Sequence, residues 1–105
     1  MATWNTETFL KESGGQKLLG VEQGAINGFS MGCTFCYATE YANPATHDDQ
    51  EGFYVVSGEG FVKLGDEEYA ISPGVCFIAR AGEAHTMRRT SPEPLKVVWA
   101  HGPVA

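Results

Sequence analysis

The feature that most constrains the fold of this chain is a succession of short apolar runs separated by closely spaced turn signals. Glycine, proline, asparagine and aspartate punctuate the sequence, and only residues 6–12 suggest a helical turn, capped by Thr6. Seven or eight short strands are expected, at residues 17–22, 29–41, 52–57, 61–64, 67–71, 75–79, 84–89 and 95–101. This pattern predicts an all-β domain, folded as an antiparallel sandwich or barrel.

Length and charge limit the class of protein and the partners it can have. A chain of 105 residues is long enough for one domain with a modest core. Its formal net charge of −6 disfavours nucleic acid and anionic membrane surfaces as partners. No apolar run approaches the roughly 20 residues of a membrane span, and the N-terminus lacks the features of a signal peptide. Together with the odd number of cysteines, three, these features predict a cytoplasmic protein.

Two histidines and a glutamate are the strongest indication of a functional site. His47 and Glu51 stand four residues apart before an apolar run, and His85 follows two further strand-like runs. If residues 47–51 are extended, His47 and Glu51 project to the same side, at the mouth of a barrel. Imidazole and carboxylate ligands suit Zn, Fe, Mn or Ni, and the spacing does not choose among these metals. The sequence therefore predicts one divalent metal ion bound by His47, Glu51 and His85.

The spacing of these residues resembles the two motifs of the cupin superfamily. The first motif, G-x5-H-x-H-x3–4-E-x6-G, is matched in its second half by His47-x3-Glu51-x6-Gly58. The second motif, G-x5-P-x-G-x2-H-x3-N, is matched by Gly74-x5-Arg80-x-Gly82-x2-His85-x3-Arg89, with two replacements. The resemblance implies a double-stranded β-helix, or jelly-roll, barrel over residues 29–101 after an N-terminal extension, residues 1–28. It also implies a bound divalent metal and, often, a homodimer.

Three departures from the family pattern bear on the site. Ala45 stands where the first metal-binding histidine is expected, Arg80 replaces the proline, and Arg89 replaces the asparagine. The implied ligand set is thereby reduced to three residues, which leaves metal positions open for water or substrate. Asp49 could serve as a fourth ligand. The alternative is a degenerate cupin that has lost its metal together with the histidine at position 45.

The implied function is a metal-dependent isomerase or lyase acting on a polar, anionic, sugar-like or hydroxy-acid substrate. Arg89, expected to face the cavity, would hold a carboxylate or phosphate, unless it serves as a salt-bridge partner. Tyr37 or His101 would move the proton. Two other functions stay open, an Fe(II)-dependent dioxygenase and a non-catalytic ligand-binding cupin. Cys33, Cys36 and Cys76 are expected to be thiols without a redox or zinc role.

Overall fold

The structure, a computed structural model, describes residue 3 and residues 15–104; the helical turn expected at residues 6–12 lies outside them. In this part of the chain the regular structure is all β apart from one short 3-10 helix, η1 (Val21–Gln23), so the predicted fold class is confirmed. None of its helices is long or apolar enough to cross a membrane. The strands are β1 (Gly15–Leu19), β2 (Ser30–Cys36), β3 (Gln50–Ser57), β4 (Gly60–Leu64), β5 (Glu67–Ile71), β6 (Cys76–Ala79), β7 (His85–Arg89) and β8 (Leu95–Gly102).

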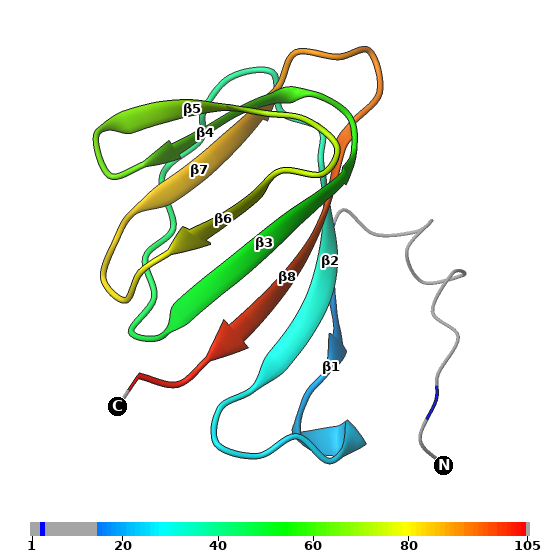
Figure 1. The fold of residues 1–105 in the computed structure, drawn as a ribbon, viewed down its shortest axis with the longest axis vertical. Helices are drawn as coiled ribbons and strands as arrows, with labels where there is room; N and C mark the ends of the chain where they lie inside the picture. The colour runs from blue at the N-terminus through cyan, green and yellow to red at the C-terminus, as the bar shows by residue number, and fades with distance from the viewer. Residues whose placement is uncertain (1–2, 4–14, 105) are drawn as a thin grey trace.

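The strands form two sheets that face each other (Figure 1). One sheet has five strands in the order β1-β2-β8-β3-β6, and the other has three in the order β5-β4-β7. All pairings within the two sheets are antiparallel. The last strand, β8, lies between β2 and β3, so segments far apart in sequence are neighbours. This is the jelly-roll arrangement expected from the sequence.

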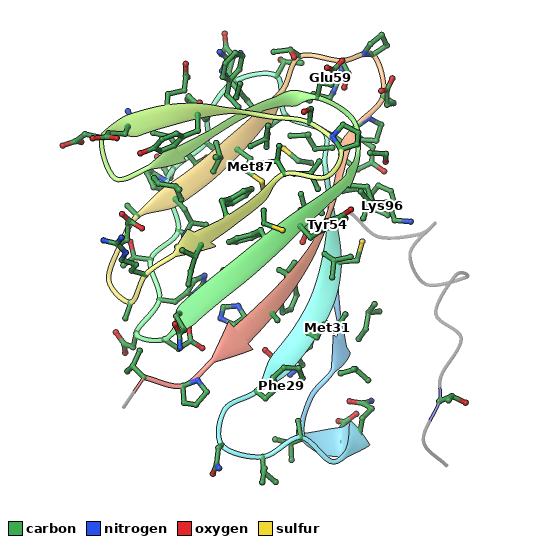
Figure 2. All side chains as sticks on the ribbon, viewed as in Figure 1. Phe29, Met31, Tyr54, Glu59, Met87 and Lys96 are labelled. Atoms are coloured by element: carbon green, nitrogen blue, oxygen red, sulfur yellow. The ribbon has the colours of Figure 1, made fainter. Side chains whose placement is uncertain are left out.

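The core lies between the sheets, and strand alternation decides which side chains enter it. On β3, Phe53 and Val55 are buried whereas Tyr54 and Val56 are exposed on the outer face. In Figure 2 the side chain of Met87 lies between the two sheets, where it packs against the core. The fully or almost fully buried cluster consists of Val55, Val62, Ile71, Leu95 and Val97.

Two glycines let the chain cross from one sheet to the other between β3 and β4. Gly58, the last residue of the first motif, has a φ of +83°, and a Cβ there would lie 2.5 Å from the carbonyl oxygen of Pro94. A Cβ on Gly60 would overlap the carbonyl oxygen of Arg88. A side chain at either position would force the backbone apart, so the motif glycine is explained by close packing at this crossing.

The structure corrects three of the expected strand boundaries. The strand expected at residues 29–41 ends at Cys36, because its partner β8 begins opposite at Leu95 and offers no ladder beyond. The strand expected at residues 17–22 is β1, at Gly15–Leu19, which pairs with β2 in the larger sheet, and residues 21–23 form η1 instead. Residues 47–51 are not extended throughout: the chain bends at residues 48–49, and β3 begins only at residue 50.

Candidate metal centre

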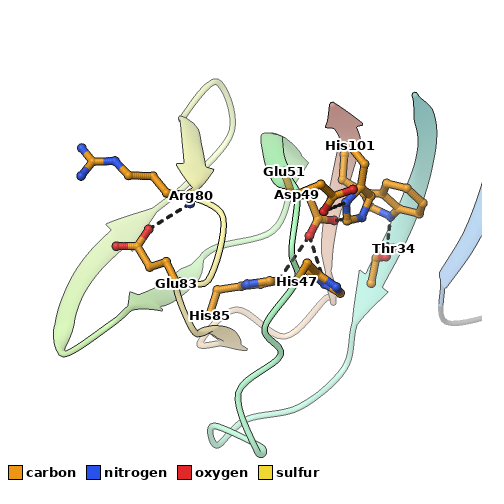
Figure 3. A network of polar contacts seen from close by, with 9 residues as sticks. Thr34, His47, Asp49, Glu51, Arg80, Glu83, His85 and His101 are labelled. Atoms are coloured by element: carbon orange, nitrogen blue, oxygen red, sulfur yellow. Dashed lines mark hydrogen bonds and ion pairs between the residues drawn. The ribbon is translucent and has the colours of Figure 1, made fainter. Parts of the chain in front are cut away.

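All three histidines of the chain converge on one carboxylate (Figure 3). The Oε1 atom of Glu51 lies 3.6 Å from Nε2 of His47 and 3.3 Å from Nε2 of His85. Its other oxygen, Oε2, lies 3.2 Å from Nε2 of His101. We call these four residues the histidine cluster. Because these three histidines are all that the chain contains, their convergence points to a common task.

Four different segments bring the histidine cluster together. Glu51 near the start of β3 pairs in register with His101 near the end of β8, so both side chains share the inward face of the larger sheet. His85 is the first residue of β7, in the smaller sheet. His47 precedes β3 and returns to Glu51 because of the bend at residues 48–49; in a fully extended strand, residues four apart lie about 13 Å apart.

Glu51 is buried without full hydrogen bonding. It is 6% exposed, and its Oε1 has no hydrogen-bond partner among the described residues; the same holds for Nδ1 of His85. The carboxylate of Glu51 raises the pKa of His85, against the lowering effect of burial. A buried carboxylate with incomplete hydrogen bonding is costly unless protonated imidazoles or a cation compensate its charge. The site therefore has the electrostatic character of a cation site.

The donor atoms fit a single metal ion. His47, Glu51 and His101 each offer one ligand atom, and these atoms all lie within 4.8 Å of one another. His85 contacts Oε1 of Glu51 from the opposite sheet and supplies a further imidazole. Imidazole nitrogens with one carboxylate oxygen are ligands that suit Zn, Fe, Mn and Ni.

Further contacts orient His101 from outside the histidine cluster. Its Nδ1 lies 3.0 Å from Oδ1 of Asp49, and its ring meets that of Trp99 edge-on, with centroids 5.3 Å apart. Trp99 is itself held in place, because its Nε1 donates a hydrogen bond of 3.0 Å to Oγ1 of Thr34. Asp49, considered above as a fourth metal ligand, thus lies on the outer nitrogen of a cluster histidine.

An open hollow lies beside the histidine cluster and contains its more exposed members. The residues that line it carry hydroxyl, carboxylate and imidazole groups, namely Ser30, Thr46, His47, Asp48, Asp49 and His101. Its volume of ≈ 640 Å³ is within the range of small-molecule sites. Among the residues that the structure describes, no lysine or arginine belongs to this lining.

Arg89 and Tyr37, expected to act on substrate, lie elsewhere. Arg89 stands four residues along β7 from His85, a separation of about 13 Å. Its Nε donates to the carbonyl oxygen of Tyr37 at 2.8 Å, and its guanidinium also bonds the carbonyl of Ser91 at 2.8 Å. The Tyr37 side chain is exposed. The alternation of side chains predicted the strand face of Arg89 but took no account of its distance along the strand, so this geometry gives no support to an anion clamp at Arg89.

The sequence suggested His101 only as a proton carrier at the end of a strand, whereas the structure places it against Glu51. The signal was present: Leu95, Val97, Trp99 and His101 alternate along the last strand, so the same face that buries Leu95 and Val97 carries His101. Ala45 forms an isolated antiparallel bridge with His85, with two backbone hydrogen bonds of 2.9 Å. Position 45 thus offers no imidazole, but β8 brings the imidazole of His101 to Glu51.

The match to a family model settles which family the chain represents. Residues 35–101, more than half of the sequence, match the model described as Cupin domain. The chain belongs to the cupin family. No curated protein matches the sequence of this cupin.

Solved structures with the same fold are similar to this cupin at low sequence identity. The TT1209 protein from Thermus thermophilus is 19% identical with a TM-score of 0.74, and the match covers 98% of both chains. The Cnp3 cupin domain of Schizosaccharomyces pombe is 13% identical with a TM-score of 0.75, over 86% of this chain and 60% of that one. The polyketide cyclase RemF from Streptomyces resistomycificus is 19% identical with a TM-score of 0.71, over 83% and 62%. This cupin thus spans less than two thirds of the length of two of these proteins, and the likeness concerns the fold alone.

Proposed function

We propose that this chain is a metal-dependent cupin that binds one divalent ion at Glu51 and acts on a small polar molecule. His47, Glu51 and His101 would hold the ion, and His85 would complete the set as a fourth donor. The observation that carries the proposal is the convergence of every histidine in the chain on one buried, incompletely bonded carboxylate. The ligand set predicted from the sequence is kept, and His101 is added to it.

A bound ion would act as a Lewis acid toward a carbonyl or hydroxyl oxygen of the substrate. The hydroxyls of Ser30 and Thr46, in the lining of the hollow, would bind the polar groups of the substrate. Of the two aspartates in the lining, Asp49 pairs with His101, which leaves the Asp48 carboxylate to accept a proton from the substrate. This arrangement supports an isomerase or a lyase reaction.

The composition of the hollow changes the expected substrate. An anionic substrate was inferred from Arg89, which bonds backbone carbonyls instead. In the described part of the chain, the lining carries two aspartates and no lysine or arginine. We therefore propose a polar, hydroxyl-bearing substrate, without the carboxylate or phosphate expected before. The similarity in fold to a polyketide cyclase supports a role in small-molecule chemistry.

The identity of the bound metal distinguishes the isomerase or lyase from the two other functions considered above. An Fe(II)-dependent dioxygenase requires iron and oxygen uptake, whereas isomerase or lyase activity would persist with zinc or manganese under anaerobic conditions. A non-catalytic binding module would carry no metal when purified. The homodimer stays a prediction, supported by the exposed apolar side chains of Tyr54, Val56 and Ile78.

Metal analysis of the untagged protein tests the proposal. The wild type should carry close to one equivalent of divalent metal, and Glu51→Gln should lose most of it, because a neutral amide is a poor ligand. Glu59→Gln is the matched control, since Glu59 is an exposed glutamate in the turn between β3 and β4. A folded Glu51→Gln variant that keeps the wild-type metal content would overturn the proposed site.

A further inference from the structure

We propose that Asp49 is a positioning residue that holds His101 in the orientation and tautomer needed for metal binding. The inference rests on the proposed metal site. Oδ1 of Asp49 lies 3.0 Å from Nδ1 of His101, while Nε2 of the same ring lies 3.2 Å from Oε2 of Glu51. The imidazole is therefore set between an outer carboxylate and the carboxylate at the centre of the histidine cluster.

The chemistry of the pair matters when His101 binds a metal ion. An ionised carboxylate can only accept hydrogen bonds, and carboxylates face both ring nitrogens, Asp49 at Nδ1 and Glu51 at Nε2. A metal ion bound at Nε2 requires that nitrogen to be unprotonated, so the ring proton is then on Nδ1 and is donated to Asp49. A carboxylate on the outer nitrogen of a metal-binding histidine fixes the ring and raises its basicity as a ligand.

The other contacts of His101 do not accept a proton from its Nδ1. Its ring meets Trp99 and His47 edge-on, with centroids 5.3 Å and 5.0 Å away. Such aromatic contacts limit the rotation of the ring but do not select a tautomer. The Nδ1 of His85, by contrast, is buried without a hydrogen-bond partner among the described residues. The outer nitrogen of His101 therefore has a carboxylate partner, which the buried outer nitrogen of His85 lacks among the described residues.

The bend at residues 48–49 offers a matched control. Asp48 and Asp49 are consecutive, carry the same charge and line the same hollow. Asp49 is half-buried against His101, while Asp48 is exposed. Removing either residue deletes one negative charge close to the metal, but only the change at Asp49 removes the acceptor for Nδ1. The pair therefore separates a positioning effect from a loss of charge.

The experiment is a calorimetric titration of zinc chloride into the metal-stripped full-length chain. Asp49→Ala should weaken zinc binding by about 10- to 100-fold, and Asp49→Asn, which keeps an acceptor oxygen, should recover most of that loss. Asp48→Ala should stay within about threefold of the wild type, because it alters only the long-range charge. Equal losses in Asp49→Ala and Asp48→Ala would overturn the positioning role, as would a failure of Asp49→Asn to recover affinity in a folded protein.

Nitrogen NMR of the histidine rings in the zinc-loaded protein provides a second readout. In the wild type and in Asp49→Asn, His101 should bind zinc through Nε2, and its Nδ1 proton should exchange slowly with solvent because a side-chain oxygen accepts it. In Asp49→Ala, that proton should exchange faster. If the wild type binds no zinc, the proposed metal site fails. If the wild type binds zinc but the Nδ1 proton of His101 exchanges equally fast in the wild type and in Asp49→Ala, positioning by Asp49 is what fails.

Discussion

Strands β3 and β8 pair along their length, and their two ends have opposite chemistry. At one end Val55 lies opposite Val97, and both are fully buried in the core. At the other end Glu51 lies opposite His101, on the same inward face. Alternation along a strand decides which side chains point inward, but it does not decide whether the interior they meet is apolar or polar. The apolar end stabilises the domain, whereas the polar end is a site whose charges need a partner.

The two ends therefore differ in what they contribute to stability. Burial of Val55 and Val97 removes apolar surface from water and favours folding. Burial of the Glu51 carboxylate with incomplete hydrogen bonding opposes folding, except where its contacts with the histidine rings compensate the charge. A protein keeps such a group when function requires it, and the polar end is where the candidate function lies.

The largest effect is expected at the apolar end. Leu95→Ala should lower the free energy of unfolding by about 2–5 kcal/mol, because Leu95 is fully buried and its removal leaves a cavity. Urea unfolding of the metal-free protein measures this loss. Val56→Ala, at a position 40% exposed on the outer face, is the control and should cost much less. A loss below about 1 kcal/mol for Leu95→Ala would show that the apolar end is not the stabilising one.

A smaller effect is expected from adding a ligand at the polar end. Ala45 pairs directly with His85, and cross-strand partners share a face, so Ala45→His should present an imidazole beside that of His85. Metal affinity should rise by about tenfold, equivalent to 1.4 kcal/mol, and turnover should fall as an open metal position is filled. Titration of metal into the stripped variant measures the affinity. Ala70→His, on exposed β5, serves as control; equal affinities for the two variants would mean that residue 45 faces away from the ion.

The smallest expected effect is a dependence of stability and of metal affinity on pH, which arises at the polar end. Glu51 raises the pKa of His85, so the protonated ring stabilises the metal-free fold below the ordinary value of 6.5, and this stabilisation is lost as the pH rises through the raised pKa. Metal affinity should change in the opposite direction, because the ion requires the unprotonated ring. Melting of the metal-free protein and metal titrations across this range measure both trends. The trend in melting should persist in Leu95→Ala and disappear in Glu51→Gln.

Three residues of the site could be predicted from the sequence, whereas the place of the fourth, His101, could not. His47, Glu51 and His85 are close in sequence to turn signals and match motif spacing, so local pattern was enough to single them out. His101 lies fifty residues beyond Glu51, and only the pairing of β3 with β8 makes them neighbours. Arg89 shows the converse limit: alternation along the strand predicted its face, but its guanidinium bonds the carbonyls of Tyr37 and Ser91, which the sequence pattern could not indicate.

By itself, the sequence determined that the chain folds into an all-β domain, and its motif spacing singled out the cupin family and His47, Glu51 and His85 as candidate ligands. These conclusions follow from local quantities, the spacing of turns, the alternation of side chains and the spacing of motif residues, which can be counted along the chain. Only the tertiary structure brought His101 to Glu51 and placed Asp49 on the Nδ1 of His101. These relations depend on strand register and on the bend before β3, which are set by packing of the two sheets and leave no fixed spacing in the sequence.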